Sequence, residues 1–263
     1  MGWQDTYNYY IVELSEPLTR NWPIISSPFE VTLITLAYLY FVLSFGPRYM
    51  KNKPPYKLKT FILIYNIIQI LANIWIVKEH ITNGWFSKYI FICIPSDPTS
   101  PSAIRLFNLV WWILLLKFFD YLETCIFVLR KKQNQVSGLH VYHHVSNVIF
   151  GWYFLKYLLD ERATFISLIN CSVHVIMYIY YFLTAWNSKL QKSLLPIKPY
   201  VTRIQLVQFF AILIVSLQAL SSSCDVSGKS HMIIIFSINI LIFIYLFYDF
   251  YKKNYIILKQ KQQ

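Results

Sequence analysis

The segment HMIIIFSINILIFIYLFYDFY, His231 to Tyr251, is an apolar run long enough to cross a lipid bilayer as a helix. A hydrocarbon core of about 30 Å requires about 20 consecutive apolar residues, and a helix satisfies its own backbone hydrogen bonds there. Similar runs recur along the 263 residues, of which 56% are hydrophobic and only 14% are charged. This composition is unlike that of a soluble domain and predicts an all-α integral membrane protein.

The apolar runs predict seven transmembrane helices. Their approximate ranges are 29–46, 60–78, 104–129, 138–157, 162–186, 201–221 and 231–251. No cleaved signal peptide, soluble domain or internal repeat is evident in the sequence. We therefore expect residues 1–263 to form one multi-pass domain, with a polar tail at 252–263.

Positively charged residues predict how the helices are oriented, because cytosolic loops are enriched in lysine and arginine. Most of the 24 lysines and arginines fall in the tail and in the connections after the first, third and fifth predicted helices. The carboxyl terminus is therefore expected in the cytosol and the amino terminus on the opposite side. The net charge of +12 then reflects this topology together with attraction to anionic lipid.

Two of the predicted connections on the non-cytosolic side each contain one cysteine, Cys93 and Cys224. That side of an endomembrane is oxidising, so these two residues are a candidate disulfide pair. The other cysteines, Cys125 and Cys171, fall inside predicted helices.

The third predicted helix contains the stretch KFFDYLET, which carries Lys117, Asp120, Glu123 and Thr124. An ionisable group inside a bilayer costs at least about 2.5 kcal/mol, so these residues require an explanation. At about 100° per residue, all four lie within one arc of the helix. Either Lys117 and Asp120 neutralise each other and the stripe joins helices, or the stripe lines a polar cavity. We favour the cavity, because joining helices rarely requires three charges.

Three of the six histidines lie in LHVYHHVSN on the fourth predicted helix. His140, His143 and His144 have the i, i+3, i+4 relation, so their imidazoles project from one helix face. On the fifth helix, in NCSVHVIMYIYY, His174 lies one turn from Asn170 and one turn from Tyr178.

The HxxHH spacing of these histidines is also found in membrane di-iron desaturases and hydroxylases. Those enzymes use several histidine boxes, whereas this chain has a single HxxHH box and six histidines in total. One zinc ion held by three or four of these residues is a further alternative. We expect no metal, since a buried imidazole can itself act as nucleophile, base or acid in acyl transfer.

Four stretches together resemble the successive signatures of the endoplasmic-reticulum fatty acid elongases, the condensing enzymes for very long chain fatty acids. In chain order they are GPRYMKNKPPYKLKTFILIYN, KFFDYLETCIFVLRKKQNQVSGLHVYHH, NCSVHVIMYIYY and YVTRIQLVQFF. The similarity covers nearly the whole chain. It implies a seven-helix bundle in which six helices form a barrel around an acyl tunnel that opens to the cytosol.

The resemblance implies that an acyl-CoA and malonyl-CoA condense to a 3-oxoacyl-CoA, carbon dioxide and CoA, without a redox cofactor. Carried onto this chain, His143 takes the acyl group and His174 faces it across the tunnel. We expect His140 and His144 to orient His143 or exchange protons with it, and Asn170 to hold a carbonyl or an imidazole.

The other predicted site residues bind substrate or line the tunnel. They are Lys117, Asp120, Glu123, Thr124, Tyr178, Thr202, Gln205 and Gln208. Lys198 and Arg203 are candidates for the phosphates of CoA. The chain departs from the family pattern of Lys, Glu and Asp-Thr, because it has Lys117, Asp120 and Glu123-Thr124. It also lacks a glycine expected near TAWNSKL.

The terminal KQKQQ resembles the KxKxx retrieval signal of endoplasmic-reticulum membrane proteins, with Lys259 and Lys261 in place. The expected partners are the bilayer, acyl-CoA, malonyl-CoA, the ketoreductase, dehydratase and enoyl reductase of the elongation cycle, and a homo-oligomer, without nucleic acid. A seven-helix receptor is the non-enzyme alternative. We disfavour it, because a receptor pocket opens on the outer side whereas this polar cluster lies towards the cytosol.

Overall fold

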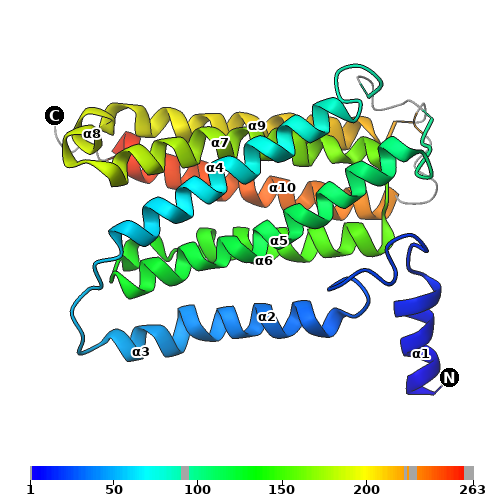
Figure 1. Cartoon of the computed structure of the whole chain (residues 1–263), viewed down its shortest axis with the longest axis horizontal. Coiled ribbons are helices and arrows are strands. Elements are labelled where there is room, and N and C mark those ends of the chain that lie inside the picture. The colour runs from blue at the N-terminus through cyan, green and yellow to red at the C-terminus, as the bar shows by residue number, and fades with distance from the viewer. Residues whose placement is uncertain (1, 90–94, 222–223, 225–229, 258–263) are drawn as a thin grey trace. The chain divides into compact units, whose positions relative to one another are not determined.

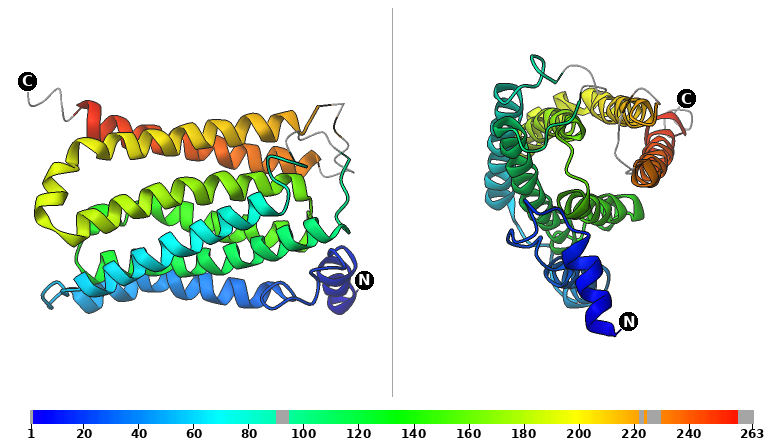
Figure 2. Two further views of the ribbon diagram at one scale, coloured as in Figure 1. Left: turned by 45° about the horizontal axis from the view of Figure 1, so that its top comes forward. Right: turned by 90° about the vertical axis from the view of Figure 1, so that its right-hand side faces the viewer.

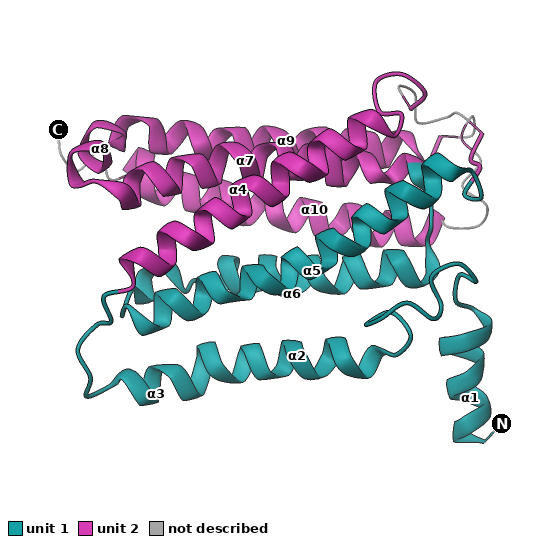
Figure 3. Cartoon of the chain, viewed as in Figure 1, with its two compact units in different colours: residues 1–57, 98–161 teal, residues 58–97, 162–263 magenta. Residues whose placement is uncertain are grey.

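The computed structural model describes residues 2–89, 95–221, 224 and 230–257. Most of these residues are helical, and no β-strand occurs among them (Figure 1). The chain divides into two compact units, which Figure 3 shows in separate colours. The first contains residues 1–57 and 98–161, and the second contains residues 58–97 and 162–263.

Three longer helices build the first unit: α2 (Pro28–Tyr40), α5 (Pro101–Leu129) and α6 (Gly138–Tyr157). A π-helical turn, Phe41–Phe45, continues α2 directly into α3 (Gly46–Met50). Shorter elements complete this unit: α1 (Trp3–Asn8), the π-helical turn Tyr9–Glu13 and the 3-10 turn Gln133–Gln135.

A serine side chain caps the start of each long helix of this unit. The hydroxyls of Ser27, Ser100 and Ser137 each accept a hydrogen bond from a backbone N–H in the first turn of α2, α5 and α6. Proline follows Ser27 and Ser100 at the first helical position, where its fixed φ suits a helix and its missing N–H costs nothing. These local signals fix where α2 and α5 begin.

α5 and α6 pack against each other and enclose most of the buried apolar side chains of the first unit. The amino-terminal segment 15–26 is bound to the end of α6. Thr19 Oγ1 donates to the carbonyl of Leu155, and Lys156 Nζ donates to the carbonyl of Ser26 at 3.1 Å. Trp152 Nε1 donates to the carbonyl of Ile24 at 3.0 Å. The segment therefore satisfies polar groups that this apolar unit would otherwise leave unpaired.

The second unit contains four longer helices. They are α4 (Lys59–Thr82), α7 (Phe165–Trp186), α9 (Lys198–Gln218) and α10 (Ser230–Tyr251). α4 packs along α7, and α9 runs beside α10, as the yellow and orange-red helices of Figure 2 show. Short elements join or extend them: the 3-10 turns Glu161–Thr164 and Leu195–Ile197, α8 (Ser188–Ser193) and the π-helical turn Lys252–Ile257.

Five helical segments of the described chain are long and apolar enough to cross a membrane. They are Pro28–Met50, Lys59–Thr82, Glu161–Trp186, Leu195–Gln218 and Ser230–Ile257. The protein is therefore an all-α, multi-pass membrane protein. α5 and α6, which carry the polar stripe and the histidine face, are not among these five. A total of seven spans, and their grouping into one domain, stay predictions.

Two sequence predictions fall outside the described residues. Cys93 is one partner of the expected disulfide, and Lys259 and Lys261 form the expected retrieval signal. Cys224 is buried, while Cys125 and Cys171 are not disulfide-bonded. The disulfide and the retrieval signal therefore stay predictions.

Replacing Gly46 with alanine should destabilise the first unit. A Cβ atom at this position would lie 2.7 Å from Val128 Cγ1 on α5 and 2.8 Å from the carbonyl oxygen of Phe41. We expect Gly46→Ala to lower the free energy of unfolding by about 1–3 kcal/mol, because α3 must move away from α5. Thermal unfolding in detergent measures this loss. Gly138→Ala is the matched control, since nothing lies within 4 Å of its added Cβ. Equal midpoints for the two variants would contradict the close packing of α3 on α5.

Candidate functional site

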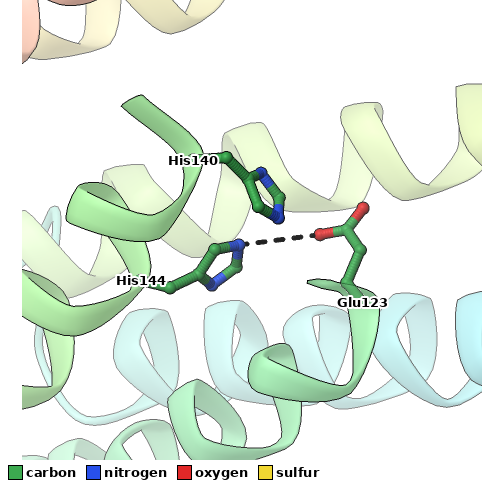
Figure 4. A group of neighbouring side chains, drawn as sticks. All are labelled: Glu123, His140 and His144. Atoms are coloured by element: carbon green, nitrogen blue, oxygen red, sulfur yellow. Dashed lines mark ion pairs between the residues drawn. The ribbon is translucent and has the colours of Figure 1, made fainter. Parts of the chain in front are cut away.

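Glu123 of α5 faces two imidazoles of α6 within the first unit (Figure 4). His144 Nε2 lies 3.8 Å from Glu123 Oε2, and the ring centroids of His140 and His144 are 4.3 Å apart. One ligand atom from each of the three residues lies within 4.8 Å of the other two. The i, i+4 spacing of the histidines places their rings one turn apart and edge to face, so both reach the same carboxyl group.

This group is largely shielded from solvent. The side chains of His144 and Glu123 are 6% and 13% exposed. His140 Nε2 is buried and has no hydrogen-bond partner among the described residues. A buried polar atom without a partner costs about 1–3 kcal/mol, so its presence is unfavourable unless something else occupies the position. The catalytic role expected of His140 stays a prediction.

His143 has a different neighbour from the other two histidines. Its Nε2 lies 3.0 Å from Asn147 Nδ2, one turn further along α6. When the amide nitrogen donates this bond, Nε2 accepts it and the ring proton is on Nδ1. Asn147 was not among the predicted site residues, although it ends the stretch LHVYHHVSN. Its i, i+4 spacing from His143 was the available signal.

The residues of the polar stripe of α5 make contacts within the stripe, to α6 and to α2. Lys117 Nζ lies 3.3 Å from Asp120 Oδ2, and both side chains are buried, so the pairing considered from the sequence is present. Glu123 faces α6 instead. Thr124 Oγ1 lies 2.9 Å from Tyr38 Oη of α2, which gives this hydroxyl a structural partner. Roles for these residues in lining a tunnel stay predictions.

Glu123, His140 and His144 could in principle bind a metal, since a carboxylate and two imidazoles form a common zinc ligand set. Zinc bonds to such atoms are about 2.0–2.2 Å long, so the ligand atoms would have to lie closer together than 4.8 Å. The expectation of a metal-free site stays a prediction.

His174 and Tyr178 form a buried pair on α7 in the second unit. Their ring centroids lie 5.7 Å apart with the planes nearly perpendicular. Tyr178 Oη lies 3.5 Å from Tyr65 Oη of α4, a residue that sequence reasoning missed. Asn170 is partly exposed, and its side chain makes no hydrogen bond within the described chain. Because His143 belongs to the first unit and His174 to the second, their apposition stays a prediction.

The predicted site residues of α9 differ in whether their polar atoms have hydrogen-bond partners within the described chain. Gln205 Nε2 donates to Met177 Sδ at 3.2 Å, and Thr202 Oγ1 lies 3.5 Å from Tyr255 Oη. Gln208 is buried, and its Oε1 has no hydrogen-bond partner in the described part of the protein. Of the three, Gln208 thus offers a buried acceptor to a ligand.

Arg203 lies between two aromatic rings at the start of α9. Its Nε donates to Tyr251 Oη at 2.6 Å, and its guanidinium carbon lies 5.2 Å and 5.4 Å from the ring centroids of Tyr200 and Tyr251. Contacts of this kind hold an arginine in place, and the Arg203 residue stays exposed. Lys198, the other phosphate candidate, is exposed.

Comparison with known proteins shows which family this sequence matches. A sequence model of the GNS1/SUR4 (ELO) family matches residues 23–263. Very long chain fatty acid elongase 7 of Drosophila melanogaster is 35% identical over 258 residues, which cover 97% of this chain and 76% of the relative. Very long chain fatty acid elongase 1 of Homo sapiens is 39% identical over 217 residues, which cover 82% of this chain and 77% of the relative. Very long chain fatty acid elongase 4 of Mus musculus is 34% identical over 258 residues, which cover 97% of this chain and 81% of the relative.

The hydrogen bond between Thr124 and Tyr38 should contribute to the stability of the site. Thr124→Val leaves the buried Tyr38 hydroxyl without this partner, and we expect the free energy of unfolding to fall by about 1–3 kcal/mol. The double variant Thr124→Val/Tyr38→Phe removes both polar groups and should recover most of that loss. Unfolding midpoints in detergent test this. A double variant that loses the sum of the two single losses would refute the pairing.

Proposed function

Because the chain belongs to the GNS1/SUR4 family, whose matched relatives are named very long chain fatty acid elongases, we propose that it condenses a long-chain acyl-CoA with malonyl-CoA. The products are a 3-oxoacyl-CoA, carbon dioxide and CoA. The observation that carries the proposal is the buried group of His140, His144 and Glu123 beside His143. Several imidazoles in one shielded place suit acyl transfer, which needs a nucleophile and a proton carrier.

In the first half-reaction, His143 attacks the carbonyl carbon of the acyl thioester. The new C–N bond forms as the C–S bond breaks, and CoA leaves as its thiolate. The acylated ring loses a proton, which His144 carries to the thiolate. His143 and His144 have ring centroids 5.4 Å apart, which supports such a transfer. Attack through Nε2 requires Asn147 to release that nitrogen, so Asn147 holds the resting ring.

In the second half-reaction, malonyl-CoA loses carbon dioxide, and the electron pair of the broken C–C bond forms an enolate. The enolate carbon attacks the acyl carbon and expels the imidazole of His143 as its anion. That ring recovers a proton from solvent through His144, which is the one proton that the overall condensation consumes. Negative charge develops on oxygen in both intermediates, so donors placed in advance accelerate the step. The candidates are His140, His144 and Asn170. Glu123 Oε2, 3.8 Å from His144 Nε2, orients the ring of His144 for this role.

The wider setting follows from the same family membership. We propose a barrel of six helices around an acyl tunnel, in the endoplasmic-reticulum membrane, with the carboxyl terminus in the cytosol. The exposed Arg203, held by the hydroxyl of Tyr251, supports binding of CoA phosphates there. The reaction needs no cofactor beyond its two CoA substrates. The ketoreductase, dehydratase and enoyl reductase of the cycle, and a second copy of this chain, are proposed partners.

Replacing His143 should abolish condensation. With labelled malonyl-CoA and a long-chain acyl-CoA, we expect His143→Ala to lower 3-oxoacyl-CoA formation by more than about 100-fold, since the acyl acceptor is lost. His231→Ala is the matched control, because His231 is an exposed histidine at the start of α10.

The same assay separates the alternatives. A metal chelator should leave the wild-type rate unchanged, whereas a di-iron oxidase or a zinc enzyme would lose activity. A receptor would incorporate no label. Normal turnover by folded His143→Ala would contradict the assignment of His143 as the acyl acceptor.

A further inference from the structure

An aromatic stripe is exposed on the amino-terminal helix, which consists of α1 and the π-helical turn that continues it to Glu13. The stripe contains Trp3, Tyr7 and Tyr10, which lie at i, i+4 and i+7, so their side chains share one helix face. They are 87%, 40% and 56% exposed and therefore contribute little to the core of the first unit. A patch of large exposed aromatic side chains marks an interaction surface.

The amino-terminal helix lies across the direction of α2 within the same unit, as Figure 1 and the right-hand view of Figure 2 both show. The segment Pro28–Met50, which contains α2, is long and apolar enough to cross a membrane. The connection of residues 14–27 joins the amino-terminal helix to the end at which this segment begins. A helix that lies across a spanning helix at its end runs along the plane of the membrane surface.

Hydrogen bonds to the end of α6 hold the amino-terminal helix in this direction. Tyr157 Oη donates to the backbone carbonyl of Tyr10 at 3.0 Å, and the backbone N–H of Glu16 donates to the carbonyl of Lys156 at 2.8 Å. The Tyr157 ring also packs on Tyr153, with ring centroids 4.8 Å apart. The aromatic stripe is therefore presented from a fixed support.

The charge of the amino-terminal helix decides which lipid fits the aromatic stripe. Residues 3–13 contain two carboxylates, Asp5 and Glu13, and no lysine or arginine. Such a helix is not drawn to anionic headgroups, which attract basic segments. Tryptophan and tyrosine instead suit the headgroup level of a bilayer, and their ring faces attract quaternary ammonium groups such as choline. Zwitterionic phosphatidylcholine therefore matches the stripe better than an anionic lipid does.

The bilayer also matches the aromatic stripe better than a second protein does. An aromatic side chain buries at most about 250 Å², so three fall short of the roughly 800 Å² that each partner gives to a standard protein interface. The surface of α2, at the other end of the connection, exposes Phe29 and Leu33, as a helix in contact with lipid does. The stripe thus extends a surface that already faces the membrane.

We propose that Trp3, Tyr7 and Tyr10 anchor the amino-terminal helix in the headgroup layer of a membrane that contains phosphatidylcholine, with the helix axis along the membrane plane. The apolar face of such an interfacial helix lies about 5–10 Å inside the boundary between headgroups and acyl chains. Because the helix is bonded to the end of α6, the anchor fixes the depth of that end relative to the membrane surface. This inference does not rest on the proposed condensation.

Difference fluorescence of the full-length protein in phosphatidylcholine vesicles tests the proposal. Subtracting the spectrum of Trp3→Phe from that of the wild type gives the emission of Trp3 alone. When the phosphatidylcholine is brominated near the headgroup end of its acyl chains, this emission should fall by about twofold or more, because the ring lies in the boundary layer. Acrylamide, a quencher dissolved in the water, should leave it nearly unchanged.

The double variant Trp3→Phe/Asn8→Trp is the matched control. Asn8 is exposed and lies about 140° from Trp3 around the same helix, so this variant moves the reporter away from the aromatic stripe. The emission of the moved reporter should be quenched by acrylamide and not by brominated lipid. Equal responses of the two reporters would contradict a one-sided stripe.

Three other results would overturn the proposal. Trp3 emission that acrylamide quenches and brominated lipid does not would place the aromatic stripe in water. Protection from both quenchers would mean that protein, such as a second copy of this chain, covers the stripe. Raised salt should leave the lipid quenching unchanged, since the helix has no basic residue. Quenching that disappears at high salt, or that requires an anionic lipid, would contradict phosphatidylcholine as the partner.

Discussion

The approach of Glu123 to the imidazoles of α6 is the interaction on which the site depends. Inside an apolar bundle neither a carboxylate nor a set of imidazoles is stable alone, so α5 and α6 must pack with these faces towards each other. Lys117 and Asp120 neutralise each other on the same helix, which leaves Glu123 to the histidines. His143 keeps a separate neutral partner in Asn147. The pairing thus places a proton-carrying group beside a nucleophile.

Hydropathy alone predicted the helices of both units closely. The expected range 138–157 coincides with α6 (Gly138–Tyr157), and 104–129 lies within α5 (Pro101–Leu129). The start of α5 differs because Ser100 and Pro101 form a cap, a signal that averaging over apolar residues does not use. The π-helical turn that joins α2 to α3 was not predictable, since its residues read as one continuous apolar run.

Periodicity likewise predicted that His140 and His144 share a face, but the partner of that face needed the packed structure. The sequence did not single out the buried Tyr65, Gln69 and Asn73 of α4, because isolated Tyr, Gln and Asn in an apolar helix resemble ordinary helix contacts. Their burial depends on tertiary contacts rather than on sequence spacing.

The central claim is that a histidine of α6 carries the acyl group between two half-reactions. Incubation of the purified protein with acyl-CoA alone, followed by intact-protein and peptide mass spectrometry, tests it most directly. We expect release of free CoA and a mass increase equal to one acyl group on the peptide that contains His143. An unmodified protein, with CoA released only after malonyl-CoA is added, would contradict it.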